Sequence, residues 1–171
     1  MKAALRLLRV KVQNVSATAE TLLSTGRGLP GAVADVGPEV WRDVLAVNLV
    51  APANLTRLLL PALRRASGHV VFINSGAGLT ARAGWSAYAA SKFGLRALAD
   101  SLRAEENGVV KVTSIHPGRT ATDMQRAVRE FEGEPFDPKE FLSPEAVAAT
   151  VRLALDAPAN ASIDTLTIRP V

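Results

Sequence analysis

The chain has 171 residues, of which 48% are hydrophobic and 21% are charged, and it contains no cysteine. This length suits one domain with a sizeable core, and the apolar content excludes a disordered chain. The absence of cysteine excludes disulfide scaffolds and thiolate metal sites, and two isolated histidines make a poor ligand set, so we expect no metal. No run of ~18 apolar residues occurs, so we expect no membrane span.

The net charge of +4 is confined to the beginning of the chain. Residues 1–30 hold the whole excess, whereas residues 31–171 carry 15 basic and 15 acidic groups. No nucleic-acid-binding motif accompanies this basic segment, so we expect no nucleic-acid partner. Met1–Val15 has an amphipathic pattern, which we interpret as a surface helix. Membrane-surface attachment or a transit role is the alternative interpretation of this segment.

Strands and helices are predicted to alternate from residue 20 onward. Thr21–Ser24 is a weak first strand. A long helix is predicted from Pro38 to about Arg65, bent or split by Pro52 and Pro61. The continuous β-branched and aromatic run His69–Ser75 predicts a strand that is buried on both faces.

The second half of the chain continues the same alternation. A second long helix is expected over Ser86–Glu106, and a strand over Val109–His116. Thr120–Leu142 is interpreted as a loop with a short helix, Ser143–Asp156 as a capped helix and Ile163–Ile168 as the final strand. Long helices between such strands require parallel crossovers, so we expect an α/β fold with a parallel sheet covered on both faces.

Three polar residues are brought together by this arrangement. Ser75 stands at the carboxyl end of a buried strand, where open α/β sheets bind ligands. Tyr88 and Lys92 lie four apart on the next helix and therefore share one face. A tyrosine has an ordinary pKa near ~10, and a lysine ammonium nearby lowers it, so the three groups suit acid–base catalysis. A Tyr–Lys pair alone is also common on an exposed helix face.

The spacing of these residues resembles that of the short-chain dehydrogenase/reductase family. Asn48 precedes Ser75 by 27 residues, and Tyr88 follows Ser75 by 13. Lys92 comes four residues after Tyr88, and Pro117-Gly118 begins 29 after it. The segments GHVVFINSGAG, YAASKFGLRALADSLRAE and HPGRTATDM are similar to the family's fifth strand, catalytic helix and the stretch after its sixth strand. The resemblance covers about residues 28–171.

The resemblance implies an NAD(P)-dependent oxidoreductase that transfers hydride between a nicotinamide and an alcohol or ketone, with Tyr88 as acid/base. Asn48, Ser75, Tyr88 and Lys92 would form its catalytic tetrad. Asn48 would fix the helix bend and hold a water, and Lys92 would bind the nicotinamide ribose. The cofactor, either NAD or NADP with NADP slightly favoured, would contact seven residues: Asn48, Tyr88, Lys92, Pro117, Gly118, Thr120 and Thr122.

Expectations for partners and location complete the prediction, and self-association is expected because the strand near Leu22 would be an unprotected sheet edge. We expect a small alcohol or carbonyl substrate, a homo-oligomer and a cytoplasmic protein. The segments Gly76–Trp85 and Met124–Phe136 would form the wall of the substrate pocket. Their apolar character suggests a fairly apolar carbonyl compound.

The family's Gly-rich phosphate turn has no counterpart in this sequence. Only 47 residues precede Asn48, and each βαβ unit takes ~30, so we expect a partial doubly wound, Rossmann-like sheet that lacks the first strands. We therefore divide the chain into an atypical segment 1–27 and a Rossmann-type part 28–171. The alternative function is a truncated, catalytically silent relative or interaction protein that does not bind the dinucleotide.

Two further features are interpreted as structural. Gly26–Gly31 spells GxGxxG, but no helix begins at its glycines and Pro30 removes a donor, which argues against a phosphate loop. His116 precedes Pro117 at a strand end, and no acid or nucleophile is placed to use it. We therefore interpret His116 as a strand-end residue.

Overall fold

Four parallel strands form one sheet in the computed structural model, which describes residues 20–23, 28 and 30–171. The predicted helix Met1–Val15 lies outside the described residues. The strand order is β1-β2-β3-β4, and each neighbouring pair is parallel. The strands are β1 (Glu20–Leu23), β2 (His69–Ile73), β3 (Lys111–Pro117) and β4 (Thr165–Ile168).

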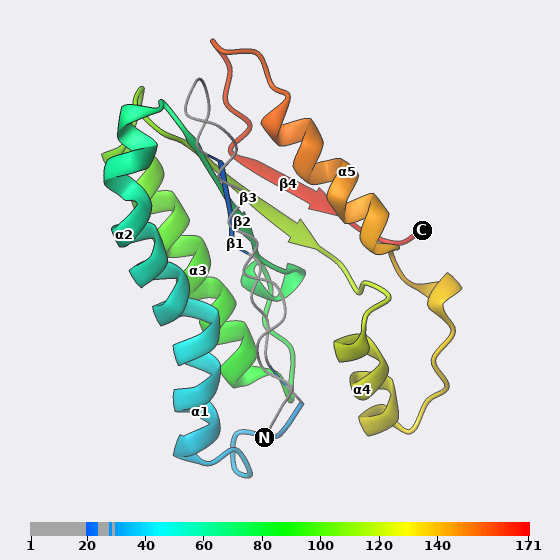
Figure 1. The fold of residues 1–171 in the computed structure, drawn as a ribbon. Helices are drawn as coiled ribbons and strands as arrows, with labels where there is room; N and C mark the ends of the chain where they lie inside the picture. Colours follow the sequence, from blue (N-terminus) through cyan, green and yellow to red (C-terminus); the bar gives the residue numbers. More distant parts are fainter. Residues whose placement is uncertain (1–19, 24–27, 29) are drawn as a thin grey trace.

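Helices connect the strands and cover both faces of this sheet, as Figure 1 shows. The long helices α1, α2 and α3 lie on one face, and α5 covers the other beside β3 and β4. This arrangement confirms the expected α/β class with a parallel sheet between helices. The helices are α1 (Pro38–Leu45), α2 (Ala51–Arg65), α3 (Ser86–Glu105), α4 (Asp123–Glu132) and α5 (Pro144–Leu155), with 3₁₀ turns η2 (Gly76–Gly78) and η3 (Pro138–Glu140).

The first long helix is continuous from Pro38 to Arg65 but contains a π-helical turn, η1 (Ala46–Val50), between α1 and α2. The main-chain N–H of Ala51 bonds to the carbonyl of Ala46 across this turn. Pro52 has no N–H for the usual bond to residue 48, so the irregularity begins ahead of it. The disruption predicted at Pro52 thus takes the form of a π-helical turn and not of a split, and Pro61 lies inside α2 without splitting it.

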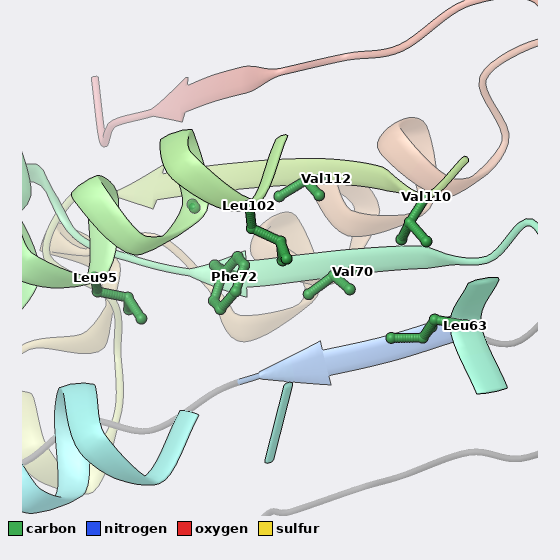
Figure 2. Close-up of a cluster of buried hydrophobic side chains, with 8 residues drawn as sticks. Leu63, Val70, Phe72, Leu95, Leu102, Val110 and Val112 are labelled. Atoms are coloured by element: carbon green, nitrogen blue, oxygen red, sulfur yellow. The ribbon is translucent and has the colours of Figure 1, made fainter. Parts of the chain in front are cut away.

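Side chains of β2 and β3 alternate between two cores. Figure 2 shows the larger core, in which Val70 and Phe72 of β2 pack with Leu95 and Leu102 of α3. Leu63 of α2 joins them from the same side of the sheet. The residues in between face α5 in a second cluster that contains Val71, Ile115 and Val151. Strand β2, which the sequence predicted to be buried on both faces, is therefore buried by the main core on one face and by α5 on the other.

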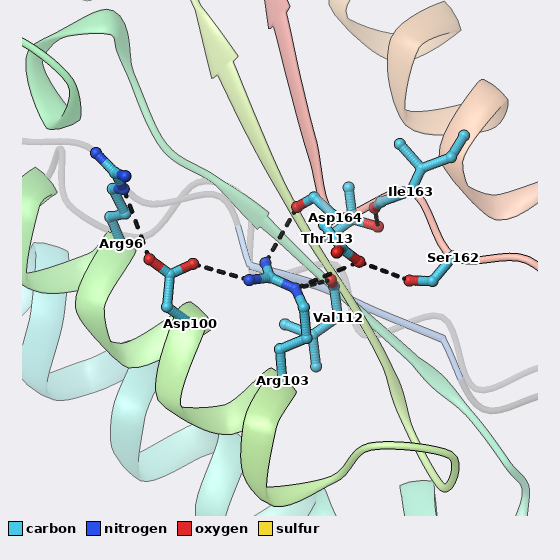
Figure 3. A network of polar contacts seen from close by, with 8 residues as sticks. All are labelled: Arg96, Asp100, Arg103, Val112, Thr113, Ser162, Ile163 and Asp164. Carbon is cyan, nitrogen blue, oxygen red and sulfur yellow. Dashed lines mark hydrogen bonds and ion pairs between the residues drawn. The ribbon is translucent and has the colours of Figure 1, made fainter.

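A polar network fastens the C-terminal half of α3 to the sheet (Figure 3). Arg103 donates to the main-chain carbonyls of Val112 at 3.0 Å and Asp164 at 3.1 Å. Asp100 accepts from Arg103 at 2.8 Å and pairs with Arg96 at 3.6 Å. Arg103 thus ties the C-terminal end of α3 to β3 and to the segment that leads into β4.

The helix Pro38–Arg65 is long and apolar enough to cross a membrane by length and composition alone. One such helix is weak evidence for a span, because core helices of globular proteins pass the same test. In this structure Leu63 is buried in the main core, and Asn48 is fully buried. The helix is thus part of the packed layer on the sheet.

Candidate active site

Ser75 is held rigidly just beyond the carboxyl end of β2. Its main-chain N–H donates to Oδ1 of Asn74 at 2.9 Å. Its hydroxyl accepts a hydrogen bond from the N–H of Ala77 at 3.1 Å and so begins the turn η2. Because Oγ accepts this bond, the hydroxyl proton remains to be donated to another oxygen.

Tyr88 lies in the first turn of α3, and its phenol interacts with the side chain of Ser75, which lowers the pKa of the phenol. The Tyr88 ring also contacts the ring of Trp85 edge to face, with centroids 5.6 Å apart. Gly28 lies against the same ring, since a Cβ built on Gly28 would lie 2.7 Å from Cδ2 of Tyr88. The phenol is therefore confined between a serine, an indole and a backbone segment.

Lys92 follows one turn later and is almost fully buried, with 1% of its surface exposed. Its Nζ donates to the carbonyl of Ile73 at 3.2 Å and lies 5.8 Å from the centroid of the Tyr88 ring. The Lys92 carbonyl accepts a bond from Nδ2 of Asn74 at 3.1 Å. Asn74 thus links the peptide of Ser75 to the helix that carries the tyrosine and the lysine.

Asn48 lies in the π-helical turn η1 and has no exposed surface. Its Nδ2 donates to the hydroxyl of Ser91 at 3.0 Å, and that hydroxyl donates to the carbonyl of Tyr88 at 2.7 Å. Of the four expected tetrad residues, Ser75 follows β2, Asn48 lies in η1, and Tyr88 and Lys92 lie on α3. The hydroxyl of Ser91 connects Asn48 to the backbone of Tyr88. The distance of 43 residues between Asn48 and Ser91 is bridged by the packing of the two long helices.

Burial controls the ionisation of this site. It raises the pKa of Tyr88 above its ordinary value, and the hydrogen bond from Ser75 offsets only part of the rise. The expectation that the neighbouring ammonium makes the phenol more acidic is therefore wrong for this structure, because desolvation outweighs it. Burial also lowers the pKa of Lys92 to about 8.

The residues after β3 continue the same edge of the sheet. Pro117 pairs with Ile168 of β4, and the N–H of Gly118 donates to the Ile168 carbonyl at 2.7 Å. The hydroxyl of Thr120 donates to the Gly118 carbonyl at 3.0 Å. Thr122 donates to the Thr120 carbonyl at 3.2 Å and caps α4 by accepting from the N–H of Gln125. Both threonine oxygens thus lie in a loop shaped by its own hydrogen bonds.

The glycines of the GxGxxG stretch pack beside the site. Gly31 donates from its N–H to the Gly84 carbonyl at 2.7 Å and forms a parallel bridge with Trp85. Neither Gly28 nor Gly31 begins a helix. These two glycines support the turn that leads into α3, whereas Gly26 lies outside the described residues.

Sequence reasoning missed Asn74 and Ser91. Asn74 stands directly before Ser75, and its amide is buried. The signal in the sequence is a polar residue at the end of an apolar run. Ser91 lies three residues after Tyr88, a spacing that places it on the same side of the helix. Among the residues that the structure describes, no group of three or more potential metal ligands occurs.

Residues 10–133 match the family model of the short chain dehydrogenases. The chain belongs to this family. The match begins upstream of residue 28, so it includes part of the segment we treated as atypical. The observed fold, a parallel sheet with helices on both faces, agrees with this membership.

Two curated relatives are similar over about two thirds of the chain. The uncharacterized oxidoreductase YciK of Escherichia coli (strain K12) is 38% identical over 121 residues, which cover 68% of this chain and 46% of YciK. Dehydrogenase/reductase SDR family member 7B of Bos taurus is 43% identical over 115 residues, or 66% of this chain and 35% of that protein. The chain thus spans about half or less of the length of these relatives.

Solved structures support the same membership. A short chain dehydrogenase from Escherichia coli CFT073, complexed with NADPH, superposes with a TM-score of 0.79 at 29% identity. The superposition covers 86% of this chain and 61% of that protein. The chain therefore shares both sequence and fold with oxidoreductases of this family.

Proposed function

We propose that this chain carries the catalytic site of an NAD(P)-dependent oxidoreductase, in which hydride passes between the nicotinamide and an alcohol or carbonyl substrate. Tyr88 is the acid/base, Ser75 binds the reacting oxygen, and Lys92 and Asn48 support them. The observation that carries the proposal is the buried Lys92, whose Nζ lies 5.8 Å from the centroid of the Tyr88 ring, beside a phenol that also interacts with the Ser75 side chain. A hydroxyl, a phenol and an amine that converge at a strand end are typical of a catalytic site.

The donor set suits the nicotinamide half of the cofactor. Lys92 and Asn48 would hold the ribose, and the loop of Thr120 and Thr122 supplies hydroxyl oxygens at the same sheet edge. Pro117 and Gly118 complete this side. Within residues 20–23, 28 and 30–171 no Gly-rich turn opens a helix for the pyrophosphate, so that part of the cofactor needs groups beyond these. The NADPH in the Escherichia coli relative supports a nicotinamide cofactor, NADP or NAD.

The site is arranged for proton donation. The cofactor supplies the hydride, and the residues of this chain supply the proton and hold the oxygen. Because its pKa is raised, Tyr88 is protonated at neutral pH and donates its phenolic proton to the carbonyl oxygen of the substrate. Ser75 directs its hydroxyl proton toward the same oxygen. The Lys92 ammonium then stabilises the phenolate that remains, 5.8 Å from its ring centroid. Alcohol oxidation uses the same groups in reverse.

The decisive experiment combines cofactor binding with one substitution. We expect saturable quenching or enhancement of NADPH fluorescence when the chain is added, and reduction of a panel of apolar ketones. Tyr88→Phe should lower turnover by about 10²–10⁴-fold, because it removes the proton donor, while the Kd of NADPH stays within about threefold. A substitution of the exposed Leu153 on α5 to Met serves as the control and should change neither value.

Two results contradict the proposal. Turnover that survives in Tyr88→Phe removes the mechanism, and failure to bind NADPH or NADH at millimolar concentration supports the catalytically silent alternative.

We also propose that the chain forms homo-oligomers, because β1 and β4 are the two edges of the described sheet. Sedimentation velocity that shows a monomer at all concentrations would argue against self-association.

A further inference from the structure

The side chain of His116, on strand β3, contacts the main chain of Ser75. His116 is the penultimate residue of β3 and has 1% of its surface exposed. Along β3 it alternates with Ile115, which faces α5, so its side chain lies on the α3 face of the sheet. Its Nδ1 lies 3.0 Å from the main-chain carbonyl oxygen of Ser75, 41 residues earlier in the chain. A carbonyl only accepts, so Nδ1 carries the hydrogen and donates it.

This contact ties Ser75 to a different strand. The Ser75 N–H is held by the adjacent Asn74, and its hydroxyl by Ala77 two residues later. Its carbonyl also accepts from the N–H of Gly78 at 3.0 Å. Those three bonds come from within three residues along the chain, and among their partners Asn74 is itself held by Lys92 of α3 and by Ile115 of β3. The bond from His116 fixes the serine peptide directly to β3, the strand whose end leads into Pro117.

Burial and the neighbouring charges together lower the pKa of His116 and keep its imidazole neutral. Burial is the largest cause of its lowered pKa, and the cations of Arg96 and Lys92 lower it further. The carboxylate of Asp100 and the bond to Ser75 act in the opposite direction and are outweighed. All three charged groups lie on α3, which covers this face. The imidazole is therefore neutral at physiological pH and keeps a single hydrogen on Nδ1.

We propose that His116 is a positioning residue for the Ser75–Tyr88 pair: its Nδ1–H anchors the Ser75 carbonyl and thereby holds the serine hydroxyl against the phenol. Without this anchor, the 3₁₀ turn after Ser75 rotates more freely and the hydroxyl leaves the phenol for part of the time. The consequence for turnover rests on the proposed function, whereas the consequence for the phenol does not. Because the Ser75 bond lowers the pKa of Tyr88, a loosened Ser75 leaves this pKa higher.

The composition of the chain makes a direct test possible. Tyr88 is the only tyrosine, so the absorbance change of tyrosinate formation, or the shift of a ¹³Cζ-labelled tyrosine, reports this one group. His116→Leu removes the donor and keeps an apolar side chain of suitable size. His116→Asn is the matched variant, because its Nδ2 offers an N–H at the same branch of the side chain. We expect a raised Tyr88 pKa in His116→Leu and an unchanged one in His116→Asn.

A second background separates positioning from general loosening. Ser75→Ala removes the hydroxyl through which His116 acts, so adding His116→Leu to it should leave the Tyr88 pKa where Ser75→Ala put it. Additive changes in the double variant, or equal pKa values in wild type and His116→Leu, overturn the proposal. If His116→Leu does not fold, ¹⁵N chemical shifts of the wild-type histidines decide, since the chain has only two. A neutral imidazole with its hydrogen on Nε2 overturns the proposal, and one with its hydrogen on Nδ1 supports it.

Activity provides the final comparison. His116→Leu should lower kcat by about tenfold, the equivalent of one hydrogen bond, with a smaller change in KM, and His116→Asn should restore most of it. If the tyrosine titration behaves as expected and the chain shows no turnover at all, His116 positions Ser75 and the proposed oxidoreductase function fails. If turnover is present and insensitive to His116, the positioning role fails alone.

Discussion

The side-chain amide of Asn48 donates a hydrogen bond to the hydroxyl of Ser91 at 3.0 Å, in an interface where neither residue has exposed surface. The same hydroxyl donates to the carbonyl of Tyr88 at 2.7 Å. Two hydrogen bonds thus connect the π-helical turn of one long helix to the first turn of the other. In a desolvated interface such a pair fixes the relative register of the helices, because shifting either one leaves buried polar groups without these partners.

Ser91→Ala should therefore destabilise the protein. The substitution removes the acceptor of the Asn48 amide and leaves this buried group short of a bond, at a cost of about 1–3 kcal/mol in the free energy of unfolding. Urea unfolding measures the change. Ser101→Ala, in the exposed part of α3, is the control and should stay within about 0.5 kcal/mol of wild type. Equal stabilities of Ser91→Ala and Ser101→Ala would contradict the coupling.

Lys92 should make the protein more stable as the pH rises from 8 toward 10. Its pKa is about 8 in the folded state, compared with the ordinary 10.5, so in this range the unfolded chain binds a proton that the folded chain lacks. The stability gain is up to about 3 kcal/mol, and it ends near pH 10, where Tyr88 begins to ionise in the unfolded chain. Unfolding at a series of pH values measures it.

Lys92→Met removes the titrating group and should remove this rise, whereas Lys139→Met at an exposed position should keep it. The prediction fails if the unfolding free energy of the wild type stays flat or falls between pH 8 and 10 and follows the curve of Lys92→Met. The buried amine would then not control the pH dependence of stability.

The sequence predicted most of the secondary structure because its signals were local. Apolar runs identified β2 and β3, and Ser143 followed by a proline identified the start of α5, where its hydroxyl accepts from the N–H of Ala146 as a cap should. The strand that we expected over Thr21–Ser24 is β1, Glu20–Leu23. The π-helical turn was missed, because a proline in a helix predicts a kink but not on which side the backbone adapts.

The candidate site was predicted in part. The strand and helix layout predicted that Ser75, Tyr88 and Lys92 lie together, whereas Asn48 was included only because of the family resemblance. The contact from His116 to the carbonyl of Ser75 was not foreseeable, because it depends on the register between β2 and β3 and on which face a strand-end residue takes. The predicted direction of the Tyr88 pKa shift was also wrong. Burial raises this pKa, and how deeply the first turn of a helix is buried depends on the tertiary packing.

Gly28→Ala should displace the Tyr88 ring. A methyl group at residue 28 would lie 2.7 Å from Cδ2 and 3.0 Å from Cβ of Tyr88, closer than van der Waals contact allows. Overpacking of this kind costs about 1–3 kcal/mol of stability, and a displaced phenol should lower turnover by about tenfold or more. Thermal unfolding and ketone reduction measure the two effects.

Gly37→Ala is the control for this substitution. There the nearest group is the flexible carboxylate of Glu39, which moves aside easily, so both values should stay close to wild type. Unchanged stability and turnover in Gly28→Ala would mean that the segment 28–31 does not confine the tyrosine.

His69 should make the protein sensitive to acid. Its Nε2 lies 2.8 Å from Oγ1 of Thr113, which donates its own proton to the carbonyl of Ile163, so Nε2 is the donor. Burial, helped by the charge of Lys111, lowers the His69 pKa to about 4. Between pH 6.5 and 4 the unfolded chain binds a proton that the folded chain excludes, so stability falls as the pH falls, by up to about 3 kcal/mol.

His69→Gln keeps an N–H donor at the ε position but does not titrate, and His116 and the carboxylates contribute equally in both proteins. The difference in unfolding free energy between the two proteins should therefore change only within this window, and identical pH profiles would show that His69 is not the group responsible.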